Sequence, residues 1–199
     1  MNASLNIFYL NNQYVTDEQI NTFTFARNYK IYNIEGEEIG LIKQRIKDWQ
    51  RVLPLLINKS ILPFKIEITD KSGVLVASVL RNFGIWNPKM KIVDEYGNVV
   101  GIVKLSLGIL SRTLSIVDPI SNKNIAKMTG DGKGWSFDVI SNKDIKIGEI
   151  NKSSLQSNTK FKEDDKYCTT IFKDYIKDIY RMPIISIAII IDMILKQSR

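Results

Sequence analysis

Residues 181–199 read RMPIISIAIIIDMILKQSR, and almost every side chain from Met182 to Leu195 is apolar. A helix of about 14 residues is about 21 Å long. The hydrocarbon core of a bilayer is about 30 Å thick, and a helix needs roughly 20 apolar residues to span it. Arg181 and Asp192 leave only ten residues between two charges. The length therefore disfavours a simple membrane anchor and favours a segment that is buried by its own protein.

Apolar residues in this segment surround the whole circumference of a helix, which is typical of a helix that is buried on all sides. Pro183 suits the first turn of such a helix, because its missing N–H would have no partner there. The many isoleucines leave a buried strand as an alternative, since β-branched residues favour strands. We expect a central helix over residues 183–196, with these buried positions: Pro183, Ile184, Ile187, Ile190, Ile191, Asp192 and Ile194.

A hairpin pattern is repeated between residues 29 and 153. Each unit has an alternating apolar run, an Asn or Asp, a turn and a second alternating run, which predicts two antiparallel strands. The units are 29–43, 64–80, 90–104, 114–128 and 137–150. Asn and Asp side chains cap turn amides, and glycine adopts positive φ without strain. The expected caps and glycines are Asn33, Asp70, Asp94, Asp118 and Asn142, with Gly36, Gly73 and Gly97.

The second strand of each hairpin contains one small residue, which often marks a bend, a bulge or the close approach of another element. Additional strands could come from Leu5–Leu10 or Phe23–Phe25 before the repeats and from Tyr167–Phe172 after them. An antiparallel sheet of about ten to twelve strands fits either a sandwich or a closed barrel. A wholly apolar helix at the end of the chain favours a sheet that wraps around that helix. The small residues are Gly40, Ala77, Gly101, Ala126 and Gly148.

Four segments together resemble the phospholipid scramblase and tubby-like superfamily, which includes the LURP-one-related proteins. They are YKIYNIEGEEIG (29–40), NFGIWNPKM (82–90), MKIVDEYGNVVGIVK (90–104) and AIIIDMIL (188–195). The likeness covers roughly residues 20–197 and implies a mainly β fold. In that fold a closed antiparallel β-barrel of about a dozen strands encloses a C-terminal hydrophobic helix. We expect a single domain over residues 1–199 with a lead-in over 1–20, and a minimal, core-only member of the superfamily.

The resemblance also points to a calcium segment, which in scramblases precedes the last strand. The matching stretch is FKEDDKYCTTIFKD (161–174), and its possible calcium ligands are Glu163, Asp165 and Asp174. Carboxylate oxygens are the ligands that Ca²⁺ prefers. Lys166 lies among them and the stretch has no glycine for a sharp turn, so an acidic solvated turn is the favoured interpretation.

The stretch LIKQRIKDWQRVLPLL (41–56) interrupts the repeat after the first hairpin. Read as a helix, it has a basic face opposite a face rich in Trp and Leu, a pattern that is typical of a helix on an anionic membrane. The alternative is a linker helix or an irregular strand that closes one end of the barrel with its apolar side. The candidate headgroup-binding residues are Lys43, Arg45, Lys47, Trp49 and Arg51.

Composition excludes several chemistries. The chain has no histidine and one cysteine, Cys168, so it lacks the commonest general base, a Cys–His pair and the ligands of a zinc site. We therefore expect no enzyme and no cofactor. A single cysteine cannot form an internal disulfide, and the N-terminus does not resemble a signal peptide, which predicts a cytoplasmic protein. Peripheral contact with a membrane is what the resemblance implies.

The net charge of +7 suits phosphate groups. The leading hypothesis, implied by the resemblance, is a non-enzymatic barrel that binds anionic lipid headgroups or associates with a membrane surface. A soluble regulatory or scaffold protein that binds another protein is the alternative, and phospholipid scrambling is a third. Nucleic-acid binding is disfavoured, because charge alone supports it and no recognisable binding-strand motif is present.

Overall fold

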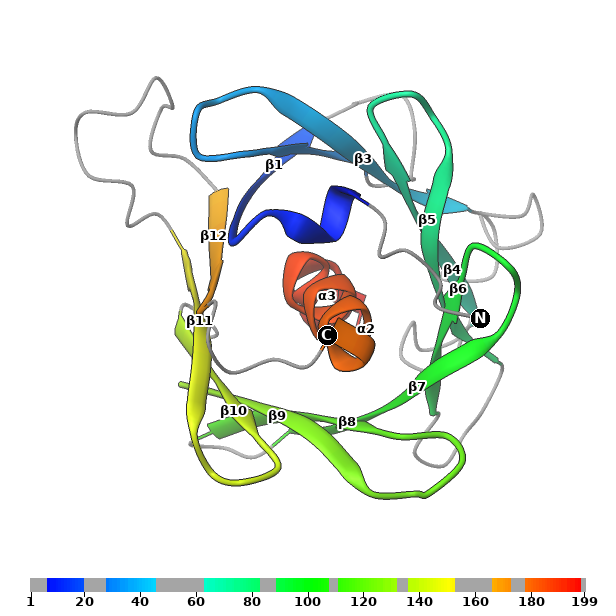
Figure 1. Cartoon of the computed structure of the whole chain (residues 1–199), viewed down its shortest axis with the longest axis vertical. Coiled ribbons are helices and arrows are strands. Elements are labelled where there is room, and N and C mark those ends of the chain that lie inside the picture. The colour runs from blue at the N-terminus through cyan, green and yellow to red at the C-terminus, as the bar shows by residue number, and fades with distance from the viewer. Residues whose placement is uncertain are drawn as a thin grey trace, which may run out of the picture.

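The computed structural model describes residues 7–19, 28–45, 63–82, 89–107, 111–131, 136–152, 166–172 and 178–197. The strands in these ranges form one closed antiparallel barrel (Figure 1). Around the barrel the strands follow their order in the sequence, and β12 closes the ring against β1. The predicted barrel is confirmed and the sandwich alternative is wrong.

The wall consists of short strands, from five residues in β2 to nine in β7. Consecutive strands from β2 to β11 pair as the five predicted hairpins, and β12 is the strand expected after them. The strands are β1 (Gln13–Gln19), β2 (Asn28–Tyr32), β3 (Glu38–Arg45), β4 (Phe64–Asp70), β5 (Leu75–Arg81), β6 (Met90–Asp94), β7 (Val99–Leu107), β8 (Ser111–Val117), β9 (Asn124–Asp131), β10 (Ser136–Ser141), β11 (Lys146–Lys152) and β12 (Lys166–Ile171).

The hairpin turns are built as the sequence predicts in four cases. Asp94 is typical: its Oδ1 accepts the backbone N–H groups of Tyr96 and Asn98 at 3.0 and 2.7 Å. Glycines at 36, 73 and 97 have φ of 83°, 82° and 89°. The fifth turn differs, because Ser141 and not Asn142 occupies the capping position. The Ser141 Oγ accepts the N–H of Ile145 at 3.3 Å, and Asp144 takes the positive φ, at 58°.

The five small residues lie beside β-bulges. In every hairpin the register shifts by one residue at this point: Ile31 pairs with Gly40, whereas the next residue, Tyr32, pairs with Glu38. Equivalent shifts adjoin Ala77, Gly101, Ala126 and Gly148. A bulge bends its strand and increases the local twist, so five bulges at one level help a sheet of this size to close. A Cβ on Gly40 would collide with the Thr69 carbonyl oxygen.

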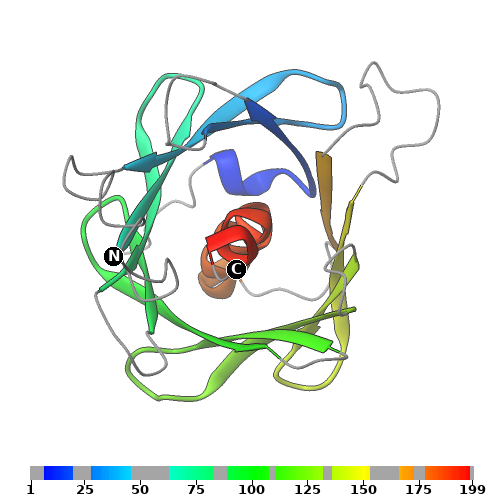
Figure 2. The same cartoon turned by 180° about the vertical axis from the view of Figure 1, so that it is seen from behind.

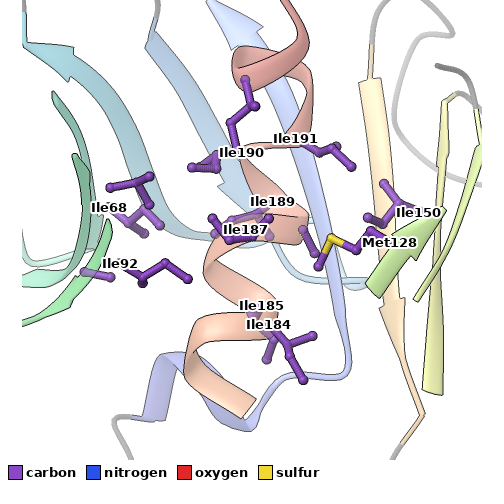
Figure 3. Close-up of a cluster of buried hydrophobic side chains, with 14 of the residues drawn as sticks. Ile68, Ile92, Met128, Ile150, Ile184, Ile185, Ile187, Ile189, Ile190 and Ile191 are labelled. Carbon is purple, nitrogen blue, oxygen red and sulfur yellow. The ribbon is translucent and has the colours of Figure 1, made fainter. Parts of the chain in front are cut away.

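Two helices, α2 (Asp178–Ile189) and α3 (Ile191–Gln197), run through the middle of the barrel (Figures 1 and 2). Their isoleucines face Ile68 and Ile92 on one side and Met128 and Ile150 on the other (Figure 3). The predicted helix enclosed by strands is confirmed, and the alternative of a buried strand is wrong. The expected interior residues are all buried: Pro183, Ile184, Ile187, Ile190, Ile191, Asp192 and Ile194.

The helix differs from the prediction at its start and in its continuity. It begins at Asp178, so Pro183 lies inside the helix and not in its first turn. A proline there cannot donate the usual hydrogen bond to the preceding turn. At Ile190 the N–H donates to the Ile187 carbonyl at 3.2 Å. This tighter, three-residue bond separates α2 from α3.

The first strand was predicted in the wrong place. The segment expected as a strand, Leu5–Leu10, contains the 3-10 helix η1 (Ile7–Leu10), and β1 follows it. Consecutive Phe8 and Tyr9 are both buried, at 3% and 1% exposure, which an alternating strand does not achieve. The Tyr14 hydroxyl donates to the Phe8 carbonyl at 2.9 Å. The alternative, Phe23–Phe25, lies outside the described residues.

The barrel has two different ends. At the turn end lie the five tight turns, residues 33–37, 71–74, 95–98, 118–123 and 142–145, and α2 begins there. At the opposite end, the loop end, strands are joined through residues 20–27, 46–62, 83–88, 108–110, 132–135 and 153–165. All the connections at the turn end are short, whereas those at the loop end include the longest in the chain, 46–62 and 153–165.

Candidate functional site

The central helix is held by polar contacts as well as by packing. The Tyr29 hydroxyl donates to Asp192 Oδ2 at 2.7 Å, and the Tyr9 hydroxyl lies 3.0 Å from Ser186 Oγ. Burial raises the pKa of Tyr9 far above its ordinary value, so this phenol stays protonated. These contacts fix the rotation of the helix inside the barrel.

Arg181 anchors the helix at the turn end. Its Nε donates to the Tyr9 carbonyl, and its Nη2 donates to the Asn11 carbonyl and to Asn12 Oδ1, both at 2.8 Å. The guanidinium is thus engaged by η1 and by the start of β1. The described side chains of the central helix are thus used in packing and hydrogen bonding inside the barrel. A binding surface is therefore expected on the barrel wall.

The inner face becomes polar toward the loop end. Arg81 stacks over the Phe64 ring, with 4.5 Å between the guanidinium carbon and the ring centroid. Burial lowers the pKa of Arg81 to about 10, so the side chain remains charged at neutral pH. Gln44 Oε1 and Arg112 Nη1 are buried with no hydrogen-bond partner, in the part of the chain that the structure describes. The apolar interior therefore ends in cationic and amide groups.

The outer face from β3 to β9 is strongly cationic. Register places Arg45 directly beside Lys65, Lys65 beside Leu80, and Leu80 beside Lys91. Farther along, Lys104 pairs with Ser115, and Ser115 pairs with Lys127. All the cations of this surface are exposed. We call the set the cationic wall: Lys43, Arg45, Lys65, Lys91, Lys104 and Lys127.

One carboxylate lies within the cationic wall. Glu67 Oε2 accepts from Arg45 Nε at 2.6 Å, and Glu67 Oε1 lies 2.7 Å from Lys65 Nζ. Partial burial would raise the pKa of Glu67, but the hydrogen bonds from Lys65 and Arg45 outweigh it and the pKa is lowered. Glu67 therefore stays ionised at neutral pH and offsets one of the two cations it contacts. The remaining charge of the wall is positive.

The cations on the outer face of the remaining strands, β10 to β12 with β1 and β2, are more balanced in charge. Lys146 Nζ lies 2.7 Å from Asp138 Oδ1 and 3.2 Å from Glu149 Oε2. Lys30 pairs with Glu38 at 2.7 Å, and Lys166 lies 3.6 Å from Asp17 Oδ2. Each of these three cations has a carboxylate nearby, so they offer little unbalanced charge to an anionic partner.

Two of the five predicted headgroup residues lie on the cationic wall. Lys43 and Arg45 are exposed on β3, so the helix predicted from residue 41 is wrong for residues 41–45. Alternation along a strand, and not helical spacing, brings these two side chains to the same face. The other three, Lys47, Trp49 and Arg51, lie outside the described residues.

Sequence reasoning missed four members of the wall, which come from hairpins far apart in the chain. The sequence did contain a pattern, because each of these residues is a lysine that alternates with apolar residues in a strand. The same pattern occurs in any strand with one face exposed to solvent, so it does not by itself indicate a binding surface. The closed strand order is needed to show that they share one surface: Lys65, Lys91, Lys104 and Lys127.

The predicted calcium ligands, Glu163, Asp165 and Asp174, lie outside the described residues. Within the described ranges, no three His, Cys, Asp or Glu side chains are grouped as a metal site would require. No helix in those ranges has the length and hydrophobicity to cross a membrane.

A model of the scramblase family matches residues 11–195, which is nearly the whole chain. The chain belongs to the scramblase family. The barrel of this scramblase-family protein is also similar to the X-ray structure of a protein from Arabidopsis thaliana. The TM-score is 0.53 at 13% identity, covering 92% of this chain and 91% of that one, a likeness that concerns the fold. No curated protein sequence matches the chain. Family membership supports a lipid-related or membrane-associated role.

Proposed function

We propose that this scramblase-family barrel binds anionic phospholipid headgroups peripherally through the cationic wall. The observation that carries the proposal is the charge asymmetry between the two sides of the barrel. Strands β3 to β9 carry six exposed cations on their outer face, and only two of them contact Glu67. On the remaining strands, Lys30, Lys146 and Lys166 each have a carboxylate nearby. Each basic residue near an anionic surface contributes about 1 kcal/mol.

The proposal includes Lys47, Trp49 and Arg51, because they follow Arg45 in the chain after β3 ends on the wall. The proposed role is non-enzymatic. In support, the chain has no histidine, and burial raises the pKa of the Cys168 thiol, which keeps it protonated and weakly nucleophilic. The proposed location is cytoplasmic and peripheral to the membrane, in keeping with a chain that has a single cysteine and no internal disulfide.

We do not extend the proposal to lipid scrambling by the central helix. Its isoleucines already pack against the inner wall (Figure 3), so a lipid path along them would require the barrel to open. A fluorescent-lipid assay in proteoliposomes tests this point. Scrambling by the purified chain would contradict it.

Vesicle co-sedimentation tests headgroup binding. The wild-type chain is expected to bind phosphatidylserine-containing vesicles at low salt and not pure phosphatidylcholine vesicles, because screening weakens such contacts. Lys91→Glu/Lys104→Glu removes two wall cations, so we expect binding to weaken by about 30-fold or more, as about 2 kcal/mol implies.

The matched control is Lys123→Glu/Lys143→Glu, which changes net charge equally through two exposed lysines at the turn end. It should leave binding close to that of the wild type. Equal losses in both variants would show that net charge alone drives binding. Equal binding to the two kinds of vesicle would reject the headgroup role.

A further inference from the structure

Among the described residues, the exposed large apolar side chains all lie at the turn end. Some are in the turns themselves, and others flank them at the starts of β7 and β1 or after β12. Ile120 and Tyr96 are the most exposed, at 95% and 76%. Among the side chains whose burial is described, the loop-end halves of β3 to β9 contribute none. The full set is Leu10, Ile34, Val74, Tyr96, Val99, Ile120, Ile145 and Phe172.

Turn geometry does not require these side chains. The turns are held by the Asn, Asp and Ser caps and by the positive-φ residues, and tight turns ordinarily select polar residues and glycine. Asp70, for example, accepts the N–H groups of Ser72 and Val74 through its carboxylate. The Val74 side chain itself is 57% exposed. Turn geometry therefore does not account for the most exposed of these side chains.

Acidic groups accompany the apolar ones along one part of the turn end. The first three turns lie side by side around the barrel, because β3 pairs with β4 and β5 pairs with β6. They carry Glu35, Glu37 and Glu95 as exposed carboxylates and Lys71 as their exposed cation. The acidic arc, as we name it, consists of Ile34, Glu35, Glu37, Val74, Glu95 and Tyr96.

We propose that the acidic arc docks a basic amphipathic segment of a partner protein. Apolar side chains of the segment would pack on Ile34, Val74 and Tyr96, and its cations would face Glu35 and Glu95. Strands lie about 4.8 Å apart, so the first and third turns are about 19 Å apart along the sheet. A helix of roughly 13 residues covers that length.

Charge complementarity selects this occupant over a membrane. An anionic bilayer would be repelled by the glutamates of the acidic arc, whereas a cationic segment is attracted. The acidic arc and the cationic wall also use different residues, so docking of a protein does not depend on the proposed lipid contact.

Synthetic peptides on the full-length chain test the proposal. The probe is a 14-residue helical peptide with leucines on one face and lysines on the other. Two comparison peptides replace the lysines by glutamate or the leucines by glutamine. We expect only the probe to bind, with NMR amide shifts concentrated in residues 33–37, 71–74 and 95–98.

Substitutions distinguish specific docking on the acidic arc from nonspecific hydrophobic binding. Ile34→Ser/Tyr96→Ser and Glu35→Lys/Glu95→Lys should each weaken probe binding by about tenfold or more. The control Ile120→Ser/Ile145→Ser removes equal apolar groups from the fourth and fifth turns and should bind as the wild type does. Circular dichroism and thermal melting establish that each variant folds.

Four results of the peptide and variant experiments would overturn the proposal. They are equal binding of the glutamate peptide, equal binding of the glutamine peptide, shifts that map away from the first three turns, and loss of binding in the control variant. Phosphatidylcholine vesicles that bind through Ile34 and Tyr96 would instead identify these residues as a membrane contact and would also reject a protein partner.

Discussion

The inner and outer faces of the barrel wall differ in how strictly the sequence repeats. Opposite the small residue of each hairpin, the inward side chain is always β-branched: Ile31, Ile68, Ile92, Ile116 and Val139. The residue just before it points outward and ranges from cationic through neutral to anionic: Lys30, Glu67, Lys91, Ser115 and Asp138. Packing against the helix constrains the first set, whereas solvent tolerates almost any polar residue in the second. Differences among the outward residues are therefore where function can be encoded.

The largest effect should come from opening a cavity at the centre. Ile187 is fully buried on α2, so Ile187→Ala should lower the free energy of unfolding by about 2–5 kcal/mol. The same change at Ile120, which is 95% exposed, should alter it by less than about 0.5 kcal/mol. Chemical denaturation of both variants measures the contrast. Similar losses would contradict the distinction between the packed interior and the solvent-exposed surface.

Removing a buried polar group on the inner face should also lower the free energy of unfolding more than removing an exposed one, but by a smaller amount than the cavity does. Tyr29→Phe removes the hydroxyl that donates to Asp192 at 2.7 Å, and hydrogen bonds to charged groups are worth about 1.5–3 kcal/mol. Tyr96→Phe removes an exposed hydroxyl and is the matched control. A double-mutant cycle with Asp192→Asn isolates the pair. No coupling between positions 29 and 192 would show that the contact is not stabilising.

The turns, where the two faces meet, should show an intermediate sensitivity. Gly97 has φ of 89°, and a Cβ added to it would meet no other atom within 4 Å. Gly97→Ala is therefore penalised by backbone strain alone, about 1–2 kcal/mol. Gly97→Asn should cost less, because Asn122 already adopts a positive φ, 55°, in the fourth turn. Thermal melting ranks the two variants. Equal stability of Gly97→Ala and wild type would show that the turn relaxes.

The periodic parts of the fold could be predicted from the sequence, because the strands and the turn cap of each hairpin are determined by residues within one short stretch. The central helix could be predicted from Met182–Leu195, since apolar groups surround that segment completely. The first strand could not, because buried Phe8 and Tyr9 look like strand residues until their contacts with Tyr14 and Arg181 are known. The fifth cap was missed by one residue because Ser141 and Asn142 are both capping types.

The surface was less predictable than the core. Lys43 and Arg45 were found as basic residues of one short segment, although a helix was the wrong reason to join them. Lys91 and Lys127 could not be joined to them from the sequence, because only the strand order brings distant hairpins onto one surface. Local pattern therefore specifies the inside of this barrel, and topology is needed to describe the outside.

The smallest expected effect on stability is at Glu67, which lies on the outer face among cations. The hydrogen bonds from Lys65 and Arg45 lower the pKa of Glu67 against the opposing effect of burial. A carboxylate with a lowered pKa contributes stability above its unfolded value of about 4.3, and this stability is lost as pH falls through the folded value. Glu67→Gln should therefore cost less than about 1 kcal/mol at pH 7, and the difference from wild type should vanish in acid.

The same substitution should have the opposite sign for binding. Removing the Glu67 charge leaves Arg45 and Lys65 unopposed, so Glu67→Gln should bind phosphatidylserine-containing vesicles about fivefold more tightly at neutral pH, as about 1 kcal/mol implies. Asp138→Asn, on the balanced side of the barrel, has the same change in net charge and serves as the control. Weaker vesicle binding by Glu67→Gln would mean that the ion pairs position the wall and do not merely screen it. A variant that loses a little stability and gains affinity would show that the outer face is not optimised for folding alone.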